Sequence, residues 1–100
     1  MAKQAIITVS REQVEADIKR ETDKGKSREE ATFHVMGHAE SGRKEAREAI
    51  EILIRDANGH ENFDDEQQKE YDRLCRTIIE PETQRIGHCK DIIAELSKPK

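Results

Sequence analysis

The stretch VMGHAESGRKEAREAIEIL, residues 35–53, decides the fold. Its small and apolar residues recur at alternating spacings of four and three, which is typical of a helix that packs along one side against another helix. They are Val35, Ala39, Gly42, Ala46, Ala49 and Leu53. Upstream, Ser27 and Glu30 have the spacing of a capping box, so we predict a helix from residue 28 to about residue 58.

A second helical pattern follows the turn signal at Gly59. A restart near Asn62 or Asp64 is followed by apolar residues at helical spacing, namely Tyr71, Leu74, Cys75, Ile78, Ile86, Cys89, Ile92, Ile93 and Leu96. Pro81 interrupts this helix, because proline lacks a backbone N–H and its ring clashes with the preceding turn; we predict a kink or restart at about Glu80. The predicted fold is mainly α, a long antiparallel hairpin of residues 28–58 and 63–97.

The segment before the hairpin contains a β-rich stretch and one short helix. QAIITVS, residues 4–10, predicts a short strand or an extended arm. Ser10 and Gln13 form a second capping-box pattern, so a helix is expected from Arg11 to Lys24, ending at Gly25. We interpret the chain as one domain, with residues 1–26 as arm and helix, 27–97 as hairpin and 98–100 as a frayed tail.

The composition favours a chain that needs a partner. Hydrophobic residues make up 33% of the 100 residues, charged residues 40%, and Trp is absent, so one copy has little to bury. We therefore expect that two hairpins may dimerise into a four-helix bundle. The longest apolar run is three residues, against the roughly 20 that span a bilayer. With two cysteines and no secretory signal pattern, the sequence predicts a cytoplasmic protein with free thiols.

Acidic residues concentrate in residues 56–72, which we call the acidic tip. Seven acidic residues stand there against Lys69 alone, so this segment carries −6 and the rest of the chain +2. Such a surface suits a protein partner with a basic surface and disfavours direct nucleic-acid binding. The predicted partner-binding residues are Glu61, Asp64, Asp65, Glu66, Glu70 and Asp72.

Three histidines are candidate metal ligands. His34 and His38 share one side of a helix, and a hairpin centred near residue 61 places His88 across from His34. A metal-binding helical bundle that uses His34, His38 and His88 is therefore an alternative function. The Glu of HExxH and the Glu-x-x-His pairs of di-iron bundles are both missing, so we predict no metal cofactor. The loop at 56–67 also lacks the Gly and the final Glu of a calcium loop.

Catalytic motifs are missing as well. The sequence has no Gly-rich phosphate loop and no nucleophile elbow. Cys89 and His88 are adjacent on a helix, where their side chains diverge by about 100°. Cys75 and Cys89 lie two heptads apart and are expected to be small core residues. We predict a protein that is not an enzyme and has no cofactor.

Three resemblances extend this reading. The order of AIITVS and the two helices after it resembles ribbon-helix-helix repressors and antitoxins, which implies a DNA-binding regulator, although residues 1–30 carry seven basic and seven acidic side chains. NFDDEQQKEYDRLCRTI, residues 62–78, is similar to a helix start in tailed-phage major capsid proteins. In size and charge the chain resembles the small acidic phage inhibitors of host defences, such as anti-restriction and anti-CRISPR proteins. This last resemblance implies a non-enzymatic inhibitor of a host nucleic-acid-binding or defence complex.

Overall fold

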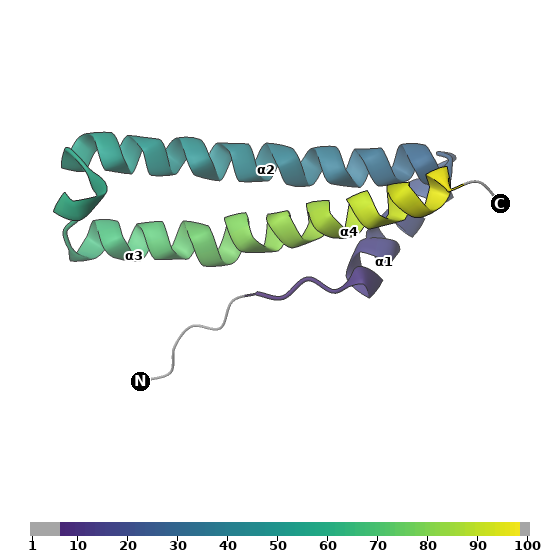
Figure 1. Ribbon diagram of the computed structural model, residues 1–100, viewed down its shortest axis with the longest axis horizontal. Helices are drawn as coiled ribbons and strands as arrows, with labels where there is room; N and C mark the ends of the chain where they lie inside the picture. The colour runs from purple at the N-terminus through teal and green to yellow at the C-terminus, as the bar shows by residue number, and fades with distance from the viewer. Residues whose placement is uncertain (1–6, 99–100) are drawn as a thin grey trace.

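The computed structural model describes residues 7–98, and most of these residues are helical. Its elements are α1 (Arg11–Asp23), α2 (Arg28–Ala57), the 3-10 turn η1 (His60–Asn62), α3 (Asp65–Leu74), the π-helical turn η2 (Cys75–Ile79) and α4 (Glu80–Ser97). Figure 1 shows α3, η2 and α4 following one another and running back beside α2, with α1 against the far end. The prediction of a mainly α fold is confirmed; among the described residues there is no strand.

The termini of α1 follow from its sequence. Ser10 accepts a hydrogen bond from the backbone N–H of Gln13, and the Gln13 side chain accepts one from Ser10, so the predicted capping box is present. Gly25 has φ +103° and ends the helix as predicted. Of the predicted strand or arm, residues 7–10 have no regular secondary structure and residues 4–6 lie outside the described residues, as do 99–100 of the predicted tail.

The loop between α2 and α3 is closed by two helix caps. Asn58 takes the left-handed conformation with φ 59°, and the Gly59 N–H donates to the Ile54 carbonyl at 2.9 Å. The end that we predicted at Gly59 is thus reached one residue earlier, because an Asn can also adopt this conformation. Asp64 caps α3 in a capping box with Gln67, as expected of a restart near Asp64.

The interruption at Pro81 is a change of helix type. Before it, the Glu80 N–H donates to the Cys75 carbonyl, five residues back, which widens the turn at Cys75–Ile79 into a π-helix. Such a turn accommodates the proline ring, which would otherwise press on the carbonyl four residues back. Pro81 itself is buried, and α4 begins at Glu80.

The core is uneven along the hairpin. We call the end where α2 begins and α4 finishes the open end, and the end at η1 the closed end. At the open end α1 adds a third helix, and its residues Val14 and Ile18 are fully buried in the core cluster with Val9, Ala31, Val35, Cys89 and Ile92. Toward the closed end only α2 and α3 pack together, and Leu53, Ile54 and Tyr71 stay half-buried. The predicted seam is therefore buried at Val35, Ala39 and Ala46 and half-buried at Gly42, Ala49 and Leu53.

Candidate functional site

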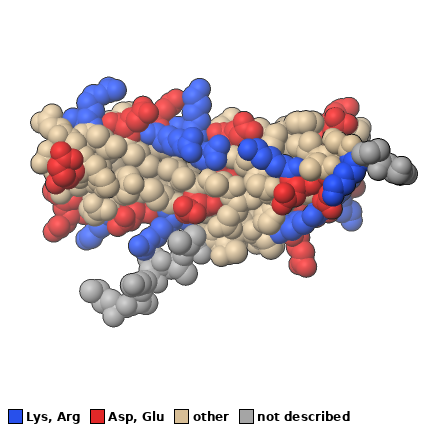
Figure 2. All heavy atoms as spheres, viewed as in Figure 1, with Lys and Arg blue, Asp and Glu red and all other residues tan. Residues whose placement is uncertain are grey.

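Three residues of the acidic tip have charges that are available to a partner. Glu61, Asp65 and Glu66 are exposed at the closed end, and within residues 7–98 none of them forms an ion pair. Figure 2 shows acidic atoms at this end of the molecule, on the left of the view. Asp65 and Glu66 lie in the first turn of α3, where the helix dipole favours negative charge. The closed end is therefore a folded surface that carries unneutralised acids.

The other three predicted contact residues are engaged in the structure. Asp64 accepts a hydrogen bond from the Gln67 N–H at 2.8 Å as the cap of α3. Glu70 forms an ion pair with Arg73, with 3.0 Å between Arg73 Nε and Glu70 Oε2, and the Arg73 guanidinium lowers the pKa of Glu70. Asp72 accepts from Gln68 Nε2 at 3.1 Å. These three side chains thus have partners within the chain, whereas Glu61, Asp65 and Glu66 have no ion pair among the described residues.

Aromatic packing holds the tip in shape. The His60 ring lies 4.7 Å from both the Phe63 and the Tyr71 rings, centroid to centroid, and the latter two are 5.8 Å apart. Sequence reasoning missed this cluster, in which His60 itself remains exposed. The signal was the placement of two of the three aromatic residues within nine positions of each other in an otherwise charged segment. The cluster gives the acidic loop a fixed conformation.

The three candidate metal ligands are not brought together. The His34 and His38 rings pack edge to face at 5.0 Å, and His34 Nε2 lies 3.6 Å from Glu21 Oε1. His88 instead contacts the segment before α1, with its Nε2 donating to the Val9 carbonyl at 3.0 Å. In the part of the chain that the structure describes, no group of three or more His, Cys, Asp or Glu side chains lies in position to hold a metal ion.

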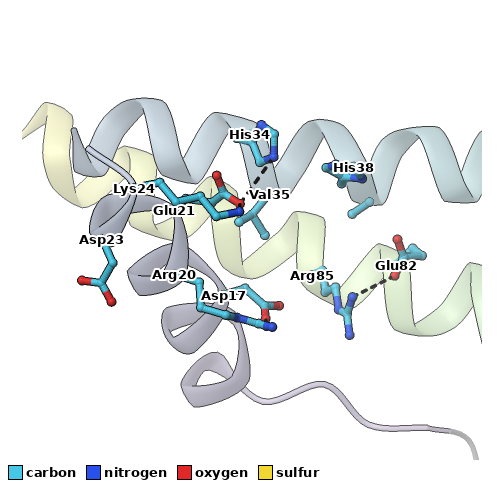
Figure 3. Close-up of a pocket in the computed structure, with 11 residues that line it drawn as sticks. Asp17, Arg20, Glu21, Asp23, Lys24, His34, Val35, His38, Glu82 and Arg85 are labelled. Atoms are coloured by element: carbon cyan, nitrogen blue, oxygen red, sulfur yellow. Dashed lines mark hydrogen bonds and ion pairs between the residues drawn. The ribbon is translucent and has the colours of Figure 1, made fainter. Parts of the chain in front are cut away.

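A hollow of about 510 Å³ lies between α1, α2 and α4, beside these histidines (Figure 3). Most of its charged groups pair with neighbours in sequence. Glu21 accepts from Lys26 Nζ at 2.7 Å and Lys24 Nζ at 3.3 Å, and the hydrogen bond from Lys26 is the main cause that lowers the pKa of Glu21 to about 2. Burial raises the pKa of Glu82, which Arg85 Nη1 approaches to 3.4 Å. Among the lining residues, the contact of Glu21 with His34 joins α1 to α2.

Both cysteines are free thiols. Cys89 is fully buried in the core cluster, and burial raises its pKa, which disfavours the reactive thiolate. Cys75 is half-buried at the start of η2. Neither residue has the exposed, cation-rich surroundings of a catalytic cysteine.

The chain stands apart from the proteins with which it was compared. No family model, no curated protein and no solved structure matches it. None of the helices between residues 7 and 98 is both long enough and apolar enough to cross a bilayer. The function is therefore argued from the geometry alone.

Proposed function

We propose that the protein is a non-enzymatic interaction protein that presents its acidic tip to a basic surface on a protein partner. One observation carries the proposal. Of the eight ion pairs among the described residues, only that of Glu70 with Arg73 involves the acidic tip, although this segment has a net charge of −6. The remaining pairs lie in or beside α1, apart from that of Arg85 with Glu82 on α4.

Unneutralised charge on a rigid surface favours fast, salt-dependent association. The like charges of the tip repel one another, and no ion pair among residues 7–98 offsets most of this repulsion. A basic surface on a partner would offset it, which is a physical reason for the charges to be there. The aromatic cluster of His60, Phe63 and Tyr71 fixes the loop and thereby lowers the entropic cost of binding. Both features support a contact at the closed end.

The finer arrangement that we propose is a pair of antiparallel hairpins joined as a four-helix bundle. It would cover the half-buried side chains that α2 and α3 leave at the closed end. In its concrete form the proposal is a cytoplasmic inhibitor of the phage type, which occupies the basic surface of a host nucleic-acid-binding or defence complex. Its support is the small size of the chain and its acidic surface.

The test neutralises the free charges of the tip and uses a matched control. The tip variant combines Glu61→Gln, Asp65→Asn and Glu66→Gln. The control combines Glu12→Gln, Asp23→Asn and Glu29→Gln, which are equally exposed, also include first-turn acids and lie in or beside α1 at the other end. Partners captured from lysate by the wild type should be lost with the tip variant and kept with the control. Equal capture by both variants would move the contact away from the tip.

A further inference from the structure

We infer that one basic surface to which the acidic tip binds is on a second copy of this chain, and that the two α2 helices pack antiparallel about a two-fold axis near residue 52. The inference rests on the proposed function, because it names a partner for the same tip. It also specifies the side of the hairpin that is covered. Three observations support it: a stripe of residues on α2, the spacing of charges along this stripe, and the surface area of the single chain.

The stripe lies on the side of α2 that α1 leaves uncovered. His34 and His38 line the hollow against α1, whereas residues spaced by four, three and four lie more than 100° around the helix from His34. They are Arg43, Arg47, Ile50 and Ile54; Met36, one turn or more before them, packs against the core cluster and is not part of the stripe. Of these residues, only Arg47 is fully exposed and the others are half-buried. The bond from Arg43 Nη1 to Thr83 Oγ1, 3.4 Å long, shows that the stripe borders α4. The stripe therefore lies beside the groove between α2 and α4, where a further helix could pack.

The order of residues along the stripe selects one register. In an antiparallel pair about residue 52, Ile50 of one copy faces Ile54 of the other. Arg43 lies nine residues before residue 52 and Glu61 nine residues after it. The basic residues of one copy therefore lie beside the closed end of the other. A register centred near residue 45 would instead place Arg43 of one copy opposite Arg47 of the other. Of these two registers, the one centred at residue 52 combines apolar contact with opposite charges.

Charge also excludes the parallel alternative. Two parallel hairpins would hold two acidic tips, each of −6, next to each other. In the antiparallel pair the tips lie on opposite sides of the axis, roughly 27 Å apart along α2 at 1.5 Å per residue. Arg43, Lys44 and Arg47 form no ion pair with the described residues and, together with Glu40, line a shallow hollow midway along α2. Figure 2 shows basic and acidic side chains interspersed across the middle of the molecule.

The area of the single chain is consistent with a missing partner. Its accessible surface is 7231 Å², about a quarter more than the roughly 5,800 Å² expected of a compact monomer of this mass. Its radius of gyration is 16.8 Å, against about 13 Å for a compact 100-residue domain. The excess area is larger than the about 800 Å² that each partner buries in a standard interface. A second copy packed along the stripe would bury part of this excess area.

The first experiment tests the side of α2 that is covered. Sedimentation equilibrium on the full chain should give a dimer whose dissociation constant rises at least about tenfold in Ile50→Lys, because the lysine enters an apolar contact. Ile52→Lys is the matched control: Ile52 is 54% exposed but lies on the opposite side of the same helix, and its variant should dimerise like the wild type. A monomeric wild type, or a larger effect at Ile52 than at Ile50, would overturn the proposal.

The second experiment tests the register and does not depend on apolar packing. Arg43→Glu and Glu61→Lys should each weaken the dimer about fivefold at low salt, and the double variant should recover most of the loss. Additive losses in the double variant would refute the antiparallel register. If the chain is monomeric while neutralising the tip still abolishes capture of another protein, the further inference fails and the proposed function stands. If the dimer forms and the tip variants capture partners normally, the proposed function fails beyond self-association.

Discussion

The side-chain oxygen of Gln84 accepts a hydrogen bond from the Val9 N–H at 2.6 Å, across 75 residues of sequence. One turn further along α4, His88 Nε2 donates to the Val9 carbonyl at 3.0 Å. Two side chains of a helix thus bind both backbone polar groups of one extended residue, and the Val9 side chain, 3% exposed, enters the core beside Val14 and Ile18. Val9 is therefore part of the folded core, while its described neighbours Ile7, Thr8 and Ser10 are exposed.

Gln84→Ala should loosen this attachment. It leaves the buried Val9 N–H without an acceptor, which costs about 1–3 kcal/mol, and should speed hydrogen exchange at Val9 more than at residues of α3. Amide exchange followed by NMR measures this. The neighbouring Thr83→Ala, on an exposed residue, is the control and should leave the Val9 amide protected.

Glu21→Gln should destabilise the protein in a pH-dependent manner, because it removes the charge that Lys24 and Lys26 bind at the end of α1. The hydrogen bonds from Lys26 and Lys24 lower the pKa of Glu21 from 4.5 to about 2, so the ionised form stabilises the fold. This stabilisation is complete above the ordinary pKa and is lost as the pH falls through about 4.5 toward 2. Thermal melts of wild type and variant should therefore differ at pH 6 and converge near pH 2. A constant difference over this range would contradict the assignment, and Glu12→Gln serves as an exposed control.

Truncations should reveal the uneven core. Ile92→Ala removes a side chain that is 1% exposed in the three-helix part and should cost about 3–4 kcal/mol of unfolding free energy. From the seam alone we would expect about 2–4 kcal/mol for Leu53→Ala, but Leu53 is half-buried and should cost about half as much in the monomer. Urea denaturation at low protein concentration compares them. Equal losses would mean that the closed end is packed as well as the open end.

Asn58 offers a test of the cap between α2 and α3. Because its φ is 59°, Asn58→Gly should be neutral or stabilising by up to about 0.5 kcal/mol, whereas Asn58→Ala should destabilise by about 1 kcal/mol. Denaturant melts of the two variants measure their free energies of unfolding. Equal free energies of unfolding for Asn58→Gly and Asn58→Ala would show that residue 58 does not retain the left-handed conformation.

Chelation tests the metal alternative. Since His88 is engaged by Val9 and away from His34 and His38, EDTA should leave the melting temperature of the wild type unchanged, as it should that of the His34→Ala, His38→Ala variant. A drop of several degrees in the wild type alone would establish a metal site.

What could be predicted from the sequence was local. Ser10 with Gln13, Gly25, and Asp64 before two acids are short signals with direct physical causes, and they placed helix ends within a residue or two. The position of α1 and the attachment of Val9 to Gln84 and His88 depend on contacts between distant residues, which a periodicity does not encode. For the same reason the acidic tip was recognised from composition, while the division into free acids such as Glu61 and paired ones such as Glu70 required the structure.

The π-helical turn at Cys75–Ile79 sets the rotation of α3 about its own axis relative to α4. It accommodates one more residue than an α-helical turn would, so the side chains before it are turned by about 100° from where a continuous helix would point them. Tyr71 lies on α3 and is among the side chains turned in this way. Deleting a single residue within 75–79 would keep both helices but turn a different face of α3 toward α2. The face that Tyr71 and the acids of α3 present is thus determined by the residue count of this turn, some distance from the charges themselves.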